Sequence, residues 1–451
     1  MLARRAASVL LLLFLPTSPA LAQGSSGLRG MIPDLFRFGD CAEPLCLNSG
    51  VSAASGHGAH YIGSTVAGTN SLLGFLSGAI ATAVASVPIS TATTGVSFAF
   101  VGGAPVETSS SAGPIFGERV QTVGRGRFLM GVNVTGVDFK AVRGVPLDNL
   151  AFTFTHQNVC RTNPNWTETN GQTCPAPLAG DTALGSPAFE NDVIEVNTSV
   201  DLSLQVASLY LTYGVLDRVD IGVAFPLVRA DLRGGSVARV IPSAATTPHF
   251  FGTASDPVLS AASGSSGTAT GIGDIAARVK VNLGGSERGA FGLLTEARFP
   301  TGNEKDFLGT GEFALRVLGI VSARYGNFSP HLNGGYLYRS GKAITDAVLT
   351  TAGFDQLVSS WATLAVDLIG QWQVGTNQLI LPGPVTFTVP YRRQTNPTNI
   401  PNRNDSLLDG SLGFKLNAGR AITIVTNALV PLNKGGLRGN LAWTTGLEYR
   451  F

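Results

Sequence analysis

Charged side chains that recur at every second or fourth position are the residues of this sequence that could act on a solute. In an extended strand, residues two apart point to the same side, so each such group would line one wall. A wall of charges attracts, repels or orients a solute without changing its covalent bonds. We therefore predict that these residues line the constriction of a channel. The set is Arg278, Lys280, Glu296, Arg298, Glu312 and Arg316.

The two signs of charge in this set leave a second role open. A channel that selects one sign of ion concentrates one sign of charge at its narrowest point. Acidic and basic residues on neighbouring strands can instead pair along the wall and stiffen it. Both roles, solute selection and wall pairing, are therefore open for these six residues.

The histidines give little support for an enzyme. Nucleophilic catalysis needs a nucleophile within reach of a base. Only His331 falls on the inward side of a predicted strand, and no nucleophile stands at a fitting spacing from it. The other histidines are His57, His60, His156 and His249. We expect no catalytic residue and no cofactor, and a hydrolase built on a barrel stays as an alternative.

Two further motifs imitate ligand sites. Gly271-Ile272-Gly273 resembles part of a dinucleotide fingerprint, but that fingerprint opens a helix, whereas the residues that follow here alternate as a strand does. Glu304, Asp306 and Glu312 stand in or next to a Gly-rich stretch and could hold calcium. A tight Gly-rich hairpin explains the stretch more simply, so we predict no metal site.

The overall composition fits neither a nucleic-acid-binding protein nor a disordered chain. Of the 451 residues, 44% are hydrophobic and 13% are charged, and the charged share is about half that of an average soluble protein. A nucleic-acid-binding face needs many more basic residues. A disordered acidic chain would lack this apolar content. We expect no nucleic-acid partner.

Alternation of polar and apolar residues runs through most of the chain after residue 90. Within 273–283, for example, Val279 and Val281 share one side of a strand, while Arg278 and Lys280 share the other. The alternating segments exceed the usual length of roughly 5–6 residues for a soluble strand, and aromatic residues stand near their ends. Strands that span a bilayer need about 9–11 residues and end in aromatic girdles.

These segments predict an all-β membrane protein. We expect a closed antiparallel transmembrane β-barrel of about 14 strands with a short N-terminal, partly helical segment, and with short turns that alternate with long connections. The apolar frame slips near Ala207, which we interpret as a β-bulge. The predicted strands are 93–102, 114–124, 126–143, 192–215, 218–233, 270–284, 289–300, 310–325, 328–340, 346–358, 361–373, 404–418, 420–430 and 439–451.

The first 22 residues predict a cleaved export signal. Two arginines precede an apolar run that is shorter than a membrane-spanning helix, and small residues at positions 20 and 22 suit cleavage. Removal of this signal leaves 29 basic and 29 acidic residues, a net charge of zero. The remaining chain divides into a periplasmic or lumen-plugging segment at 23–90, with a short packed helix at 71–86, and a barrel at 91–451.

The cysteines predict two disulfide bonds. An exported chain enters an oxidising compartment, where cysteines close in sequence pair readily. The pairs by proximity are Cys41 with Cys46 and Cys160 with Cys174.

The last strand carries an assembly signal. Leu447 and Tyr449 alternate towards the final residue, Phe451, and this pattern resembles the C-terminal signature of bacterial outer-membrane barrels. The resemblance implies that the barrel assembly machinery is a partner, and that lipids and lipopolysaccharide of the bacterial outer membrane surround the protein. No predicted strand has a polar stripe on its lipid face, so we expect a monomer.

Several segments resemble the outer-membrane transporter family associated with meta-pathway phenol degradation. They are YGVLDRVDIG at 213–222, FPL at 225–227, GIGDI at 271–275, RFPTG at 298–302 and SPHLNGGY at 329–336. The resemblance covers about 190–451 well, and it implies passage of small hydrophobic or aromatic molecules across the outer membrane. Barrels of the fatty-acid-transporter type are similar more distantly, and their N-terminal plug motif has no evident match here. A structural or adhesive barrel without transport is the alternative.

Overall fold

The computed structural model describes most of the barrel and parts of the N-terminal region. The described residues are 27–39, 45, 48–49, 74, 80, 98–101, 104–107, 112–155, 192–242, 249–253, 255–286, 288–341, 345–375, 381, 383–387, 392–419 and 421–450. Among them, no helix has the length and apolar character needed to cross a bilayer. The predicted export signal at 1–22 lies outside the described residues and stays a prediction.

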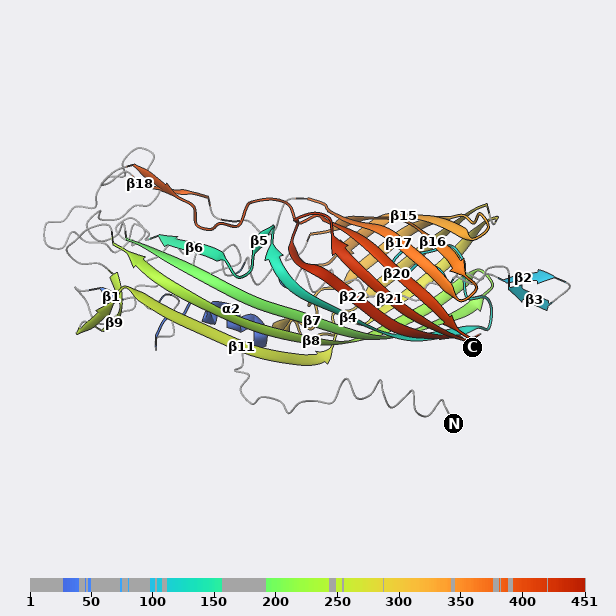
Figure 1. Ribbon diagram of the computed structural model, residues 1–451, viewed down its shortest axis with the longest axis horizontal. Coiled ribbons are helices and arrows are strands. Elements are labelled where there is room, and N and C mark those ends of the chain that lie inside the picture. Colours follow the sequence, from blue (N-terminus) through green and yellow to red (C-terminus); the bar gives the residue numbers. More distant parts are fainter. Residues whose placement is uncertain are drawn as a thin grey trace.

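Twelve antiparallel strands close into a barrel (Figure 1). The ring runs in the order β8, β12, β13, β14, β15, β16, β17, β20, β21, β22, β4 and β7, and β7 pairs with β8 to close it. The bounds are β4 Phe128–Val142, β7 Val193–Leu216, β8 Val219–Ile241, β12 Ala276–Ser286, β13 Gly289–Arg298, β14 Ala314–Ser322, β15 Phe328–Arg339, β16 Ala347–Ser359, β17 Ala362–Gln373, β20 Leu407–Ala418, β21 Ile422–Pro431 and β22 Leu437–Arg450.

The remaining elements are short, apart from β11, and lie outside this ring. They are α2 Gly27–Asp34, η3 Glu304–Asp306, β1 Asn48–Ser49, β2 Phe98–Val101, β3 Ala104–Glu107, β5 Val145–Pro146, β6 Leu150–Thr155, β9 His249–Thr253, β10 Asp256–Val258, β11 Ser260–Ile272, β18 Val385–Phe387 and β19 Arg393–Thr395.

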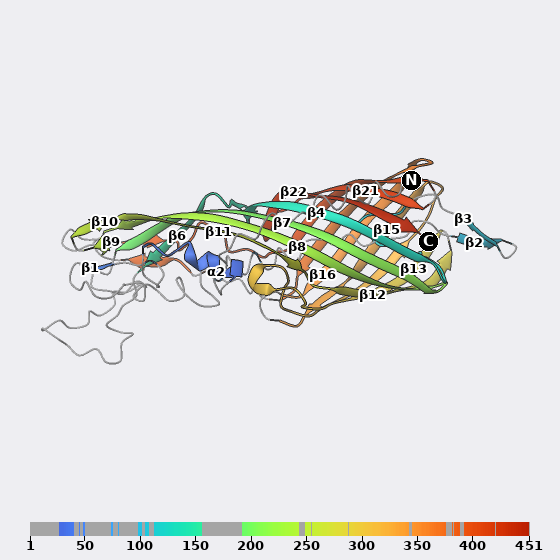
Figure 2. The same ribbon diagram turned by 90° about the horizontal axis from the view of Figure 1, so that it is seen from below.

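The two ends of the barrel differ in their connections. The end at which β22 finishes is called the turn end here, because each connection between neighbouring strands at this end has at most five residues. The opposite end, the loop end, has the connections 143–192, 242–275 and 374–406. Figure 2 shows the long strands continuing past the barrel at the loop end. The predicted alternation of short turns with long connections is confirmed for these three connections, whereas the loop-end connection 432–436 has five residues, as many as the longest turn-end connection.

The barrel is polar inside and apolar outside, which is the reverse of a soluble protein. Inward side chains such as Lys280 and Glu296 are buried, whereas the outward side chain of Phe291 is 60% exposed. Exposed aromatic residues gather at both rims, as in membrane barrels: Tyr325, Phe328 and Trp361 near the turn end, and Phe299, Tyr338 and Trp372 near the loop end. An exposed apolar band with aromatic edges belongs in a lipid bilayer.

The barrel has two strands fewer than the predicted count of about 14. Segment 93–102 was expected in the wall, but its described part is β2, which pairs only with β3. Segment 114–124 forms no strand. Its neighbouring residues Glu118 and Arg119 would point to opposite faces of a wall strand, so one charge would enter the lipid. Inside the barrel, both side chains are buried and reach the wall.

Two strands of the ring continue far beyond the barrel at the loop end. Beyond the barrel, β7 pairs with β6, and β8 pairs with β11. Together these four strand segments form a sheet that we call the extension (Figures 1 and 2). From Gln205 to Val193, β7 rises by roughly 40 Å at the usual strand spacing.

The apolar face of β7 and β8 changes sides where they leave the barrel. On the turn-end side of this point, Leu209 and Phe225 face outward and are exposed, while Ser208 faces the lumen. On the loop-end side of this point, the outward positions are polar, as at Gln205, and the inward positions are apolar, as at Val206. The change of face at Ala207 to Gln205 therefore marks the loop-end edge of the lipid band.

This change of face corrects the predicted β-bulge near Ala207. A bulge would shift the pairing register, but β7 and β8 pair without interruption from Val193 to Gly214, and the only shift lies between Gly214 and Leu216. The frame slip in the sequence therefore arises from a change of surroundings, from lipid outside to an apolar core inside, and not from an extra residue.

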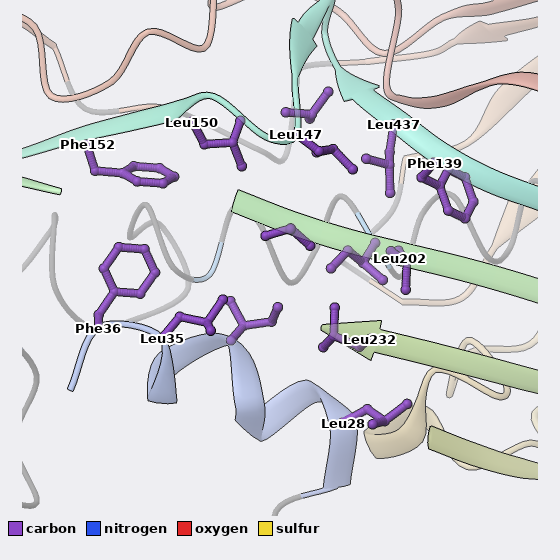
Figure 3. Packing of buried hydrophobic residues seen from close by; sticks show 14 of the residues in the cluster. Leu28, Leu35, Phe36, Phe139, Leu147, Leu150, Phe152, Leu202, Leu232 and Leu437 are labelled. Carbon is purple, nitrogen blue, oxygen red and sulfur yellow. The ribbon is translucent and has the colours of Figure 1, made fainter. Parts of the chain in front are cut away.

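An apolar core fills the concave side of the extension. Helix α2 lies against β11 there and contributes Leu28 and Ile32 to the core, and Leu35 and Phe36 follow directly after the helix (Figure 3). The ring of Phe36 meets Phe152 edge-on, with 5.4 Å between the ring centres. Complete burial of a leucine or phenylalanine contributes about 1.5–3 kcal/mol, so this core holds α2 against the extension.

Candidate functional site

Residues 112–124, which we call the lumen segment, lie inside the barrel at its turn end. The segment forms no strand, and backbone N–H groups along it donate to wall side chains instead. The acceptors are Thr363 for Ala112 (3.0 Å), Asp367 for Phe116 and Gly117 (3.4 Å each), Asn333 for Glu118 (2.8 Å), Ser322 for Val120 (3.2 Å) and Asp220 for Val123 (3.0 Å).

These acceptors place the path of the segment. Thr363, Ser322 and Asp220 lie within two residues of the turn-end limits of β17, β14 and β8. Asp367 and Asn333, which hold the middle of the segment, lie several residues further into the barrel. The lumen segment therefore enters from the turn end, bends near Gly117 and returns to begin β4.

Apolar side chains of the segment fill the space between opposite walls. Ile115 packs with Ala365 and Val425. Val120 belongs to a cluster with residues of β13 and β14, and Val123 to one with residues of β4, β7, β8 and β12. With its polar contacts to β15 and β16, the segment touches strands all round the barrel, so it obstructs the lumen.

An ion pair with no exposure ties the segment to β16. Arg119 Nη1 lies 3.2 Å from Asp355 Oδ2, and both side chains are 0% exposed. Two further nitrogens of Arg119 have no hydrogen-bond partner among the described residues. Removing one partner of a buried pair leaves the other charge buried and uncompensated, which costs about 3–5 kcal/mol, so loss of Arg119 alone would destabilise the closed lumen.

The preceding residue, Glu118, reaches the opposite side of the lumen. Its carboxylate lies 3.2 Å from Arg278 Nη1 and 3.7 Å from Lys280 Nζ. All three side chains are at most 10% exposed. Asn333 accepts from the Glu118 N–H and donates to the Glu118 carbonyl, which fixes the backbone that presents the carboxylate.

His331 and Asp367 form a buried pair next to Gly117, at the bend of the segment. The distance from His331 Nε2 to Asp367 Oδ1 is 2.7 Å, and both side chains are fully buried. Ser322 lies opposite His331 across the strand pair, but its hydroxyl accepts the Val120 N–H. His331 Nδ1 has no hydrogen-bond partner among the described residues. The pair therefore positions Asp367 for the segment and activates no described hydroxyl.

The structure brings five of the six predicted lumen residues together on one wall. Arg278, Glu296 and Arg316 stand in one cross-strand row on β12, β13 and β14. Arg316 Nη2 lies 2.7 Å from Glu296 Oε2, so part of the charge does pair along the wall. The remaining two of the five are Lys280 and Arg298, one row to either side.

The sixth predicted residue, Glu312, precedes β14 and stands in the connection 299–313 at the loop end. Its carboxylate lies against Gly341. Two residues of the same connection, Gly302 and Thr310, donate backbone hydrogen bonds to Asp274, which precedes β12. The described residues contain no group of three or more potential metal ligands.

Sequence reasoning missed the residues that hold the lumen segment. Asp355 and Arg119 were not singled out, and neither was Arg339, which faces inward in the same row as Arg298. The adjacent charges Glu118 and Arg119 were the available signal, because a wall strand cannot point two neighbouring charges to the same side.

The remaining predicted sites lie at or beyond the limits of the described residues. Cys41, Cys46, Cys160 and Cys174 lie outside them, and so does Phe451. Leu447 and Tyr449 face outward on β22 and are exposed, and their role in assembly stays a prediction.

The predicted plug segment 23–90 is described only in part. Its described residues include α2, Leu45 and Ile80, which pack in the core of the extension at the loop end. The predicted helix at 71–86 lies outside the described residues except for Gly74 and Ile80. The described residues that occupy the lumen are those of the lumen segment, further along the chain.

Comparisons with known proteins give only remote structural similarity. No family model matches the chain, and no curated protein matches it. An outer membrane channel from Pseudomonas putida F1 is 12% identical with a TM-score of 0.40, over 74% of this chain and 98% of its own. The toluene transporter TbuX of Ralstonia pickettii is 10% identical with a TM-score of 0.32, over 81% and 98%.

The translocator domain of the autotransporter NalP from Neisseria meningitidis is 10% identical with a TM-score of 0.25, over 74% of this chain and 91% of its own. These three structural neighbours are named for different functions. Similarity this low assigns none of those functions to this chain.

Proposed function

We propose that this protein is a channel of the bacterial outer membrane whose lumen segment closes it at rest. The observation that carries the proposal is the obstruction of a polar lumen by residues 112–124, which hydrogen bonds and ion pairs hold instead of strand pairing. A segment held by side chains can leave without breaking the barrel, whereas a wall strand cannot.

The polar lumen favours transport over a purely structural barrel. A wall that only had to be stable could be filled with apolar side chains, because buried ion pairs are weak contributors to stability. This wall instead keeps buried charges such as Lys280, Glu296 and Lys415. The polar lining and the removable segment together suit a water-filled path.

The cargo is a small molecule. The sequence motifs at 213–222 and 329–336 resemble a transporter family linked to phenol degradation, which implies small hydrophobic or aromatic compounds. The loop end faces the cell surface and the turn end faces the periplasm, as short turns do in this class of barrel. The export signal, the assembly machinery as a partner and a monomeric state are parts of the same proposal.

Solute flux into liposomes tests the channel. We compare the intact chain with a variant in which residues 114–121 are replaced by a short Gly-Ser linker, using a neutral sugar as solute. Liposomes with the variant should swell faster than liposomes with the intact chain. A folded variant barrel, verified by its heat-sensitive gel mobility, that admits no solute would contradict the proposal and favour a structural role.

A further inference from the structure

The inward faces of β12–β15 carry an excess of positive charge. We call their five cations the basic wall: Arg278, Lys280, Arg298, Arg316 and Arg339. Glu296 is the one carboxylate that these four strands carry. On the neighbouring strand β8, Asp220 stands opposite Lys280, and both of its oxygens accept the Val123 N–H of the lumen segment.

The acids on the other side of the lumen already have partners. Asp355 pairs with Arg119, Asp409 with Arg438, and Glu448 with Lys415. Asp367 bonds to His331 Nε2 and to backbone N–H groups of the lumen segment. The two sides therefore differ, because on the basic wall two carboxylates serve four cations: Glu118 lies by Arg278 and Lys280, and Glu296 lies by Arg298 and Arg316.

The cations of the basic wall stand in successive cross-strand rows between the loop end and the lumen segment. Arg298 and Arg339 stand in the row nearest the loop end, Arg278 and Arg316 in the next row, and Lys280 beyond them. Successive rows are about 7 Å apart along a strand. An anion that entered from the loop end would pass at least one cation in each of these rows.

The two cations nearest the lumen segment already bind a carboxylate of the protein itself. Glu118 of the lumen segment lies on Arg278 and Lys280, at 3.2 and 3.7 Å. The basic wall thus already binds a carboxylate, and that carboxylate belongs to the segment that closes the channel.

We propose that the cargo carries a carboxylate, and that this carboxylate displaces Glu118 from Arg278 and Lys280 and so releases the lumen segment. The proposal rests on the proposed channel function and names its class of cargo: a small organic acid, which for an aromatic compound means an aromatic acid. Displacement exchanges one ion pair on the wall for another and breaks no covalent bond, so Arg278 and Lys280 keep a carboxylate partner.

The test is the current through planar bilayers that contain the full chain, with sodium benzoate or benzyl alcohol added at constant ionic strength. The two compounds share an aromatic ring and differ in charge. Benzoate should raise the open probability and benzyl alcohol should not. An equal response to both, or no response to benzoate, would overturn the proposal.

Variants locate the response. Lys280→Gln and Arg278→Gln each remove a contact of Glu118 as well as a contact of benzoate, so each should raise the resting current and shrink the further rise that benzoate causes. Glu118→Gln should open the channel without benzoate. Arg239→Gln, at an exposed position of the extension, is the matched control and should respond as the intact chain does. Unchanged responses in folded Lys280→Gln and Glu118→Gln barrels would also overturn the proposal.

The linker variant separates this proposal from the channel itself. If that variant conducts but prefers neither anions nor benzoate, the inference about cargo fails and the channel stands. If a folded linker variant carries no current at all, the proposed function fails as well.

Discussion

Gly117 of the lumen segment and His331 of β15 are packed so closely that a Cβ on Gly117 would lie 2.1 Å from His331 Nε2. The same Cβ would lie 2.9 Å from Asp367 Oδ1. The bend of the segment and the His331–Asp367 pair therefore fit together only with glycine at position 117.

A side chain at position 117 should open the channel. Gly117→Val forces either the segment or the buried pair to move, and overpacking of this kind costs about 1–3 kcal/mol. Because the segment has no strand partner, we expect it to move and the resting current to rise. Planar-bilayer current checks this. Gly334→Ala, where an added Cβ meets nothing within 4 Å, should leave the current unchanged.

Loss of the Arg119–Asp355 pair should loosen the segment without unfolding the barrel. Arg119→Met leaves Asp355 buried beside an apolar chain, which costs about 3–5 kcal/mol, and the segment can avoid this cost by leaving the lumen. We expect frequent openings with an unchanged heat-sensitive gel shift. The exchanged pair, Arg119→Asp with Asp355→Arg, should restore part of the closure. An Arg119→Met channel as quiet as the intact one would show that the pair does not hold the segment.

The lipid boundary at Ala207 predicts that the same substitution costs different amounts of folding free energy at two positions on one face of β7. Leu211→Arg places a charge in the apolar band and should destabilise folding into vesicles by about 2–4 kcal/mol. Ser203→Arg lies on the same face above the boundary and should cost less than about 1 kcal/mol. Urea titration in lipid vesicles measures both. Equal costs would mean that the boundary is misplaced.

The core of the extension should unfold separately from the barrel. Phe36 packs edge-on against Phe152 and Phe154, and Phe36→Ala should cost about 3–5 kcal/mol. Because that core lies beyond the lipid band, we expect faster hydrogen exchange in β6 and α2, with the exchange of β13–β17 unchanged. Faster exchange throughout the barrel would argue against a separate core.

The wall of the barrel was predictable because one physical rule governs it. A strand between lipid and water alternates with period two, and the twelve strands of the ring all lie within or overlap predicted segments. The basic residues Arg278 and Arg316 and the acidic residue Glu296 fell on the inward side for the same reason. The prediction failed in the lumen segment and at the change of face near Ala207.

The segment 114–124 was predicted as a strand, although its apolar residues do not alternate. Ile115 and Val120 are five residues apart, so a strand would turn them to opposite faces, and in the structure they pack against different parts of the wall. The apparent slip at Ala207 has another origin, since the sequence records which side is apolar but not whether lipid or a protein core lies there. Partners far apart in sequence, such as Arg119 and Asp355, follow from closure of the barrel and leave no local pattern.

The most direct test of closure by the lumen segment removes the segment and then adds it back as a separate peptide. The linker variant that lacks residues 114–121 is placed in a planar bilayer, and its current is recorded before and after a synthetic peptide of residues 112–124 is added on the turn-end side. We predict a steady current that the peptide blocks, and no block by a peptide in which Glu118 and Arg119 are exchanged. A linker variant that is folded yet carries no more current than the intact chain would contradict closure by this segment.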